Sequence, residues 1–99
     1  MGFNLKKLRD SARDQSCVSC GSTEGVVLCH YTGARRLAFN GGLGCKVDDI
    51  VAAHLCQRCH RRMDTESRSK AGKWEHSEEF LFYCARTWIR WVEQGVVKI

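Results

Sequence analysis

Apolar residues at helical spacing open the chain. Leu5, Leu8 and Ala12 recur every three or four positions and predict a short helix over residues 4–14. Asn4 is a suitable N-cap residue for this helix. The charged residues of the segment lie on the opposite face, which we expect to be solvated, with phosphate contacts as the alternative.

A longer apolar stripe lies near the end of the chain. Its i, i+3, i+4 spacing predicts a helix over residues 77–94 that stops at Gly95, with His76 on the surface just before it. We expect this regular stripe to pack into the core rather than to stack against bases. The apolar tail over residues 96–99 could add a strand at a sheet edge. The stripe consists of Phe80, Leu81, Cys84, Trp88, Trp91 and Val92.

The middle of the chain alternates between apolar runs and polar, glycine-containing segments. Residues 26–32 are β-branched and apolar and predict a strand. Residues 33–48 are rich in glycine and predict a loop, whereas residues 50–55 could form a second strand or lead into a helix. That helix is expected over about residues 56–66, and the polar stretch over residues 65–75 predicts a mobile loop.

Composition narrows the class of protein. The chain has 99 residues, so we expect one domain over residues 1–99. Its net charge is +5, from 16 Lys and Arg against 11 Asp and Glu. This balance favours a polyanionic partner, nucleic acid before a membrane, with scattered solvated charges as the alternative. No apolar run approaches the roughly 20 residues of a membrane span and no secretory signal is evident, so we expect a cytoplasmic protein.

The cysteines predict a metal site. All seven are expected to be thiols or metal ligands, because a chain without an export signal seldom forms disulfides. Four of them form two Cys-x-x-Cys pairs separated by 35 residues, and Gly21 after the first pair allows the tight turn of a zinc knuckle. Two redox dithiols are the alternative, but the βαβ context that they require is not evident. The predicted ligands of a closed, structural Zn²⁺ site are Cys17, Cys20, Cys56 and Cys59.

A second set of chemically active side chains begins beside the second cysteine pair. His60 follows Cys59 directly, and Asp64 lies four residues further along the same helical face. Together they can bind one divalent cation, and the strand that ends near His30 could present a base opposite them. The alternatives are that His60 assists the zinc and that Asp64 pairs with a nearby arginine. His54, on the approach to the cysteine pair, is a less favoured additional ligand.

These motifs resemble those of the HNH, or ββα-metal, endonucleases of the subgroup with two Cys-x-x-Cys knuckles, and especially its small phage and prophage members. The resemblance runs from Leu8 to the residues after Gly95 and is densest in residues 26–31, 41–50 and 55–60. It implies a small α+β zinc-stapled domain. The core would be a ββα-metal, treble-clef-like unit, with an N-terminal helix and a long C-terminal helix around it.

The resemblance also implies residue roles. In this family the first histidine is the general base, the middle residue orients that base or the hairpin, and the last histidine binds the metal. These roles fall on His30, Asp49 and His60. Asp49 stands where Asn is usual, and Cys29 precedes the base where an acidic residue or His is usual. Asp64 or Cys29 would complete the site on His60 for a catalytic Mg²⁺, Mn²⁺ or Zn²⁺, and a thiolate would favour the softer metal.

The activity implied by the resemblance is hydrolysis of DNA to 5′-phosphate ends by a phage- or prophage-encoded enzyme in the bacterial cytoplasm. One alternative is a DNA-binding zinc module without catalysis. Another is an adaptor in phage DNA packaging or recombination that contacts its partner through Trp74 and the 65–75 loop. The sequence leaves open whether the protein acts as a homodimer. Flanking phosphates would be held by Arg35, Arg36, Arg61 and Arg62.

Overall fold

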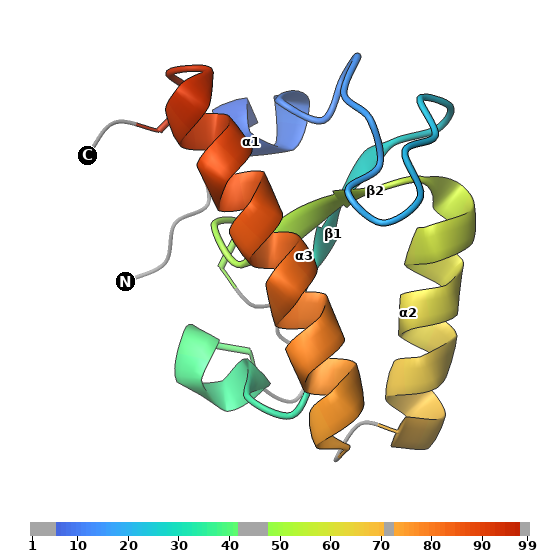
Figure 1. Cartoon of the computed structure of the whole chain (residues 1–99). Helices are drawn as coiled ribbons and strands as arrows, with labels where there is room; N and C mark the ends of the chain where they lie inside the picture. Colours follow the sequence, from blue (N-terminus) through green and yellow to red (C-terminus); the bar gives the residue numbers. More distant parts are fainter. Residues whose placement is uncertain (1–5, 42–47, 71–72, 98–99) are drawn as a thin grey trace.

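Figure 1 shows the computed structural model, which describes residues 6–41, 48–70 and 73–97. This part of the chain contains a two-stranded sheet and three α-helices, so the predicted small α+β class is confirmed. The elements in chain order are α1 (Lys6–Asp10), β1 (Val27–His30), a short 3-10 helix η1 (Arg36–Phe39), β2 (Ala52–Leu55), α2 (Gln57–Lys70) and α3 (Trp74–Glu93).

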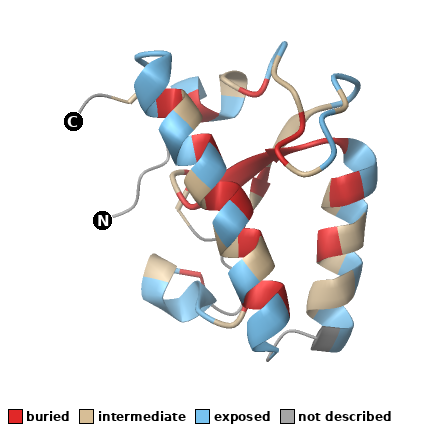
Figure 2. Ribbon diagram, in the orientation of Figure 1, coloured by how far each residue is buried: buried red, intermediate tan, exposed pale blue. Residues whose placement is uncertain are grey.

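The two strands form an antiparallel pair on which the helices assemble. β1 pairs with β2 so that Val27 lies opposite Leu55 and His30 lies opposite Ala52. A lone two-stranded sheet is marginally stable in water, so other elements have to cover it. α3 packs against β2, and α2 leaves the end of β2 and stands beside α3 (Figure 1). All four residues of β2 are therefore buried (Figure 2).

The segments around the sheet refine the sequence prediction. β1 is shorter than the predicted strand over residues 26–32, and residues 50–55 contribute a strand rather than the start of a helix. The loop predicted over residues 33–48 contains η1, which ends at Asn40 in the left-handed conformation, with φ of 68°. Cys45, for which the sequence indicates no role, lies outside the described residues, as does the predicted N-cap Asn4.

Tyr31, directly after β1, organises the core between the sheet and α3. Its ring meets the ring of Phe80 edge-on, with centroids 5.4 Å apart. Its hydroxyl bonds to Ser77 Oγ and accepts a hydrogen bond from the backbone amide of Arg35 at 2.8 Å. A Cβ atom on Gly33 would lie 2.5 Å from that hydroxyl, so the close approach of the chain to the ring requires glycine there.

α1 is held against the sheet and α3 by one buried side chain and one hydrogen-bond network. Leu8 is fully buried. Ser11 Oγ accepts from Trp91 Nε1 at 2.6 Å and lies 3.1 Å from His54 Nε2. Arg90 donates to His54 Nδ1 at 3.1 Å, so both ring nitrogens are occupied within the protein. Burial, helped by the charge of Arg90, lowers the pKa of His54 to about 4, which fits a neutral structural histidine rather than an additional metal ligand.

α2 is longer than predicted. The prediction of a mobile loop over residues 65–75 is wrong for the first half of this stretch, where α2 continues to Lys70. No glycine or proline interrupts the helix in this stretch, and side chains support it. Arg62 pairs with Glu66 one turn on, and the Ser67 hydroxyl donates to the carbonyl of Asp64 at 2.9 Å.

α3 begins at Trp74, three residues before the predicted start, and this changes the place of His76. His76 was expected on the surface, but it is buried in the first turn. Its Nε2 lies 3.1 Å from the backbone carbonyl of Met63 in α2, and its ring meets Phe80 edge-on. The expectation is wrong because the earlier start turns this residue toward α2.

The apolar stripe of α3 is only partly core. Phe80, Cys84 and Trp91 are fully buried, as predicted. Trp88 and Val92 are 37% and 41% exposed, so the core prediction is wrong for these two residues. They lie at the border of the buried face, where the indole nitrogen of Trp88 donates to the backbone carbonyl of Ile50.

The helix ends where the sequence predicts, but the tail forms no strand within the described residues. Gly95 follows α3 with φ of +74°, and the amide of Val96 donates back to the carbonyl of Trp91 at 2.8 Å. In the ranges that the structure describes, no helix is both long and apolar enough to cross a membrane.

Candidate functional site

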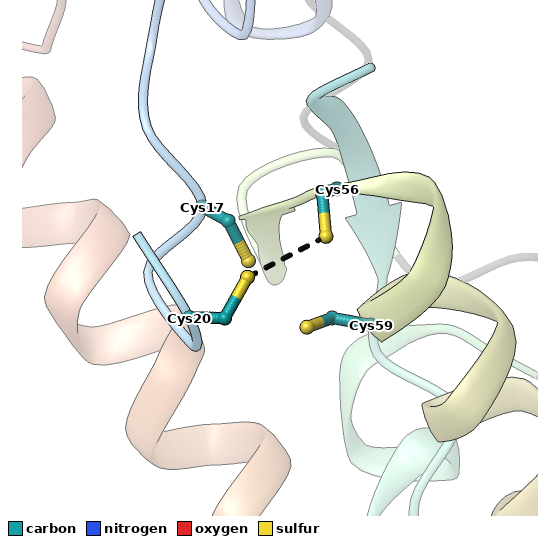
Figure 3. A group of neighbouring side chains, drawn as sticks. All are labelled: Cys17, Cys20, Cys56 and Cys59. Carbon is teal, nitrogen blue, oxygen red and sulfur yellow. Dashed lines mark hydrogen bonds between the residues drawn. The ribbon is translucent and has the colours of Figure 1, made fainter. Parts of the chain in front are cut away.

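The four cysteines predicted as metal ligands converge. One sulfur from each of Cys17, Cys20, Cys56 and Cys59 lies within 4.8 Å of all the others. Figure 3 shows the thiols pointing toward a common centre, two from the loop before β1 and two from the start of α2. Cys20 Sγ and Cys56 Sγ are 3.7 Å apart. Four sulfurs at this spacing match the tetrahedral ligand set of a structural metal such as zinc.

The first cysteine pair lies in a tight backbone turn. The amide of Cys17 donates to the carbonyl of Ser22 at 2.7 Å, and the amide of Gly21 donates to the carbonyl of Cys17 at 2.9 Å. Gly21 has φ of +82°, a conformation that a side chain would strain. The amide of Ser19 approaches Cys17 Sγ to 3.4 Å, as expected for a turn that stabilises thiolates.

The second pair lies where β2 passes into α2. Cys56 immediately precedes the helix and Cys59 lies in its first turn. Negative charge is stabilised at this end of a helix, which favours thiolates there. The amide of Val18 donates to the carbonyl of His54 at 2.9 Å, so the first knuckle is also bonded to β2. The two halves of the cluster are therefore held by backbone contacts as well as by any bound metal.

The protonation of the thiols supports a cation at this position. Hydrogen bonding from the backbone at Ser22 and from Arg58 lowers the pKa of the exposed Cys20 thiol to about 6. Burial, with hydrogen bonding to the neighbouring Cys56 adding to it, raises the pKa of the Cys59 thiol to about 12. Four thiolates cannot share one partly buried space unless a cation offsets their charge. The donor set and its electrostatics thus fit a divalent metal.

A second cluster lies one turn further along α2. One ligand atom from each of Cys29, His60 and Asp64 lies within 4.8 Å of the other two. His60 Nε2 is 3.1 Å from Asp64 Oδ2, and both side chains are partly exposed. Cys29 comes from β1 and is buried. Burial, with the charge of Asp64 adding to it, raises the pKa of the Cys29 thiol, which a bound cation would reverse. Sulfur, nitrogen and oxygen donors on two elements can hold one divalent cation with open positions.

His30, the residue after Cys29 in β1, forms a separate pair with Asp49. His30 Nε2 lies 2.6 Å from Asp49 Oδ1. The Asp49 side chain is 4% exposed, and its second oxygen accepts from Arg9 of α1 at 3.1 Å. When the carboxylate accepts a hydrogen bond from Nε2–H, the imidazole keeps a lone pair on Nδ1. The pair is therefore suited to proton abstraction through Nδ1.

The last two residues of β1 belong to the two different groups. Cys29 contributes to the metal-binding cluster with His60 and Asp64, and His30 contributes to the pair with Asp49. Successive side chains of a strand point to opposite faces, so the two groups flank the end of the strand. Both residues predicted as alternatives to complete the site on His60, Asp64 and Cys29, lie in the candidate metal-binding cluster.

A hollow of about 250 Å³ opens on the surface at the second cluster. It contains two metal-ligand candidates, His60 and Asp64, and two arginines. Among the described residues, neither arginine forms an ion pair with a carboxylate. A negatively charged ligand in this hollow would therefore meet free cationic groups. The hollow is lined by Gln57, His60, Arg61, Asp64, Thr65 and Arg68.

The other predicted phosphate contacts have different surroundings. Arg62 donates to Glu79 at 2.7 Å and also pairs with Glu66, so it links α2 to α3. Arg35 lies over the exposed ring of Trp74, with its guanidinium carbon 4.9 Å from the ring centroid. Arg36 is exposed at the start of η1. Arg62 is thus held in an ion pair within the protein, whereas the side chains of Arg35 and Arg36 are exposed to solvent.

Two basic residues of the site were not predicted. Arg68 lies one turn beyond Asp64 and lines the hollow. The i, i+4 spacing would have revealed it if the polar stretch had been recognised as helix. Arg9 contacts Asp49 from 40 residues away, and no local pattern in the sequence indicates that contact.

Fold and site together define a small α+β protein with two candidate metal centres and a histidine–carboxylate pair beside one of them. No family model matches the sequence, and no solved structure matches it. Two curated relatives do: "Putative nuclease YbcO" of Escherichia coli (strain K12) and "Putative nuclease ybcO" of Enterobacteria phage 82. Each is 32% identical to this chain over 100 residues, covering 95% of the chain and 99% of the relative. The chain therefore belongs to the YbcO family.

Proposed function

We propose that this protein is a metal-dependent DNA endonuclease of the HNH type. One observation carries the proposal: Cys29 and His30 are consecutive at the end of β1, and the first belongs to the candidate metal-ligand set with His60 and Asp64 while the second is hydrogen-bonded to Asp49. The names of the YbcO relatives support a nuclease, and their sources support a phage or prophage origin. An enzyme of this kind would act on DNA in the bacterial cytoplasm.

His30 is the general base of the proposed reaction. Its Nδ1 takes a proton from a water molecule while Asp49 holds Nε2–H. The water oxygen attacks phosphorus in line, the bond from phosphorus to the 3′ oxygen breaks, and the leaving oxygen takes a proton from solvent. The products are a 5′-phosphate and a 3′-hydroxyl. His30 then returns its extra proton to solvent, so the base is regenerated.

The two metal centres have different roles in this proposal. The four-cysteine site holds a structural Zn²⁺, because four protein ligands leave no position open to substrate. The second site is catalytic, and a divalent cation there would stabilise the charge that develops on the phosphoryl and leaving oxygens. Cys29, His60 and Asp64 would hold it, and the sulfur donor favours Zn²⁺ over Mg²⁺ or Mn²⁺.

Basic residues around the hollow would bind the DNA backbone. Arg61 and Arg68 face the hollow beside the proposed catalytic ligands, and Arg35 and Arg36 are accessible at the start of η1. Arg68 lies four residues beyond Asp64, which is roughly 6 Å along a helix axis, so it can reach a phosphate next to the cleaved one. Arg62 would contribute only if DNA displaced Glu79 from it.

A plasmid-cleavage assay across Mg²⁺, Mn²⁺, Co²⁺ and Zn²⁺ tests the proposal. Wild-type protein should nick or linearise plasmid with at least one of these ions. His30→Ala should lose cleavage by roughly 100-fold or more while keeping its bound zinc and its thermal midpoint, because a general base contributes about 10²–10⁴ in rate. Arg13→Ala is the matched control and should cut normally, because the exposed Arg13 side chain forms no hydrogen bond or ion pair with the described residues.

The ligand assignment has its own test. Cys29→Asp replaces a soft donor by a hard one and should shift the preferred ion from Zn²⁺ or Co²⁺ toward Mg²⁺ or Mn²⁺. An unchanged metal profile would remove Cys29 from the ligand set. Salt-sensitive DNA binding without cleavage in any metal would instead identify a non-catalytic DNA-binding module.

A further inference from the structure

Arg9 of the N-terminal helix is linked to the candidate base His30 through the carboxylate of Asp49. Arg9 Nη1 donates to Asp49 Oδ2 at 3.1 Å, and Asp49 Oδ1 lies 2.6 Å from His30 Nε2. The two oxygens of a single carboxylate thus join α1 to the end of β1. We propose that Arg9 is a positioning residue for His30, an inference that rests on the proposed nuclease function. Arg9 acts through Asp49 and has no contact with the reacting atoms.

The burial of the three side chains supports this role. The Asp49 side chain is 4% exposed, whereas that of Arg9 is 51% exposed. Without Arg9, one oxygen of a buried carboxylate loses its charged donor, and such an oxygen is costly to leave unpaired. The carboxyl group would then rotate or admit water, and His30 would lose its fixed partner. Because the Arg9 side chain is 51% exposed, its removal should have a mainly local effect.

The hydrogen-bonding pattern explains what Arg9 controls. An ionised carboxylate only accepts hydrogen bonds, so it selects the imidazole form with a proton on Nε2 and a lone pair on Nδ1. Arg9 keeps one oxygen engaged, which leaves the other aligned with the ring. Both the ring orientation and the tautomer of His30 therefore depend on Arg9.

α1 is placed independently of this contact. Leu8 is fully buried, and Ser11 is bonded to Trp91 and His54. The neighbours of Arg9 on the helix thus fix its position, and the ion pair with Asp49 follows from that position. Arg13 is exposed on the next turn of the chain and has no such contact, so it provides a charge-matched control.

The kinetic test uses the full-length, zinc-loaded protein in single-turnover cleavage of a DNA duplex, with the ion that is most active on plasmid. Arg9→Ala should lower the maximal rate by about 10- to 100-fold with little change in KM, as is typical when a supporting hydrogen bond is removed. Arg9→Lys should recover part of the rate, and Arg13→Ala should behave as wild type. In the Asp49→Ala background, Arg9→Ala should cost little more, because both changes interrupt one chain of contacts.

Three kinetic outcomes would overturn the inference. A raised KM at an unchanged maximal rate would make Arg9 a phosphate contact. Fully additive losses with Asp49→Ala would place the two residues in separate roles. A rate loss that matches the unfolded fraction from thermal melting would make Arg9 merely structural.

A second readout separates this inference from the proposed function. Nitrogen-15 NMR of the imidazole groups, with His30 assigned from His30→Ala, reports the tautomer without any cleavage. Wild type and Arg13→Ala should show the Nε2–H form of His30, and Arg9→Ala should show a mixed or altered tautomer. If wild-type protein cuts no DNA, the nuclease proposal fails but this measurement still decides the role of Arg9. An unchanged His30 spectrum in Arg9→Ala would refute the positioning role of Arg9.

Discussion

Removal of the metal from the four-cysteine site should unfold the protein or bring it close to unfolding. The sheet has two strands and is marginal by itself, and the first knuckle is bonded to β2 while the second opens α2. The four thiols therefore join the elements that cover the sheet. Their metal is expected to carry a large share of the stability.

The size of the stability loss can be estimated from typical free energies. A domain of 99 residues has a free energy of unfolding of roughly 5–15 kcal/mol. Structural zinc in small domains is worth roughly 10–16 kcal/mol at neutral pH. Even a metal present at only a thousand times its dissociation constant adds about 4 kcal/mol. At about 4–8 °C per kcal/mol, that minimum lowers the thermal midpoint by roughly 16–32 °C.

The assay is thermal unfolding, followed by circular dichroism with and without a strong zinc chelator, with zinc content measured in parallel. Cys20→Ser is the informative variant because Cys20 is exposed, so the change removes a ligand with little loss of packing. It should melt at the low temperature of the chelated wild type and respond little to chelator. Cys84→Ser is the control: Cys84 is a buried cysteine outside the cluster, so the variant loses packing energy but should keep its full response to chelator.

A wild-type midpoint that moves by less than about 4 °C on complete zinc removal would refute this reasoning, because it corresponds to less than about 1 kcal/mol. In that case the hydrogen bonds of the knuckle would suffice to hold the turn.

Three further predictions concern charge and packing. Arg61→Ala should reduce the slope of log affinity against log salt for DNA binding by about 0.9, as for one lost phosphate contact, whereas Arg86→Ala on the exposed side of α3 should leave it unchanged. Hydrogen bonding from Arg62 lowers the pKa of Glu79, so this carboxylate stabilises the fold above pH 4.5 and loses its effect as pH falls through the lowered pKa. The stability advantage of wild type over Glu79→Gln in urea titrations should therefore be greatest near neutral pH and shrink below about pH 4.5. Gly33→Ala should lower stability by about 1–3 kcal/mol by thermal melting, because its Cβ would lie 2.5 Å from a tyrosine hydroxyl that is held in place.

Most candidate ligands of the two metal sites were accessible from the sequence because they are related by short spacings. A Cys-x-x-Cys turn brings two sulfurs together within the turn itself, and an i, i+4 pair on a helix brings His60 and Asp64 to one face. The two Cys-x-x-Cys pairs come together because β1 and β2 run antiparallel and return the chain. Spacing therefore predicted the four cysteines and the pair of His60 and Asp64, whereas Cys29 was indicated only by the resemblance to the HNH family.

Contacts that depend on the exact placement of helices were not accessible. Composition suggested a loop after Asp64, but local side-chain hydrogen bonds extend α2, which moves Arg68 to the hollow. The start of α3 was misplaced by three residues, and His76 consequently changed from surface to core. Arg9 and Asp49 are distant in sequence and meet through the docking of α1, which no periodicity reveals.

The order of residues at the start of α2 makes one more prediction, which links the two metal centres. Cys59 and His60 are consecutive, and the amide of His60 donates to the carbonyl of Cys56 at 2.8 Å. Loss of the metal from the four-cysteine site should therefore shift His60 relative to Cys29 on β1. Cys20→Ser, studied at a temperature where it remains folded, should bind Co²⁺ at the second centre at least 10-fold more weakly than wild type, as is typical when support for a ligand is removed. The visible absorption of Co²⁺ with a sulfur ligand reports this binding, and Cys84→Ser should titrate as wild type does. Equal Co²⁺ affinity in Cys20→Ser would show that α2 holds His60 in position without help from the metal of the four-cysteine site.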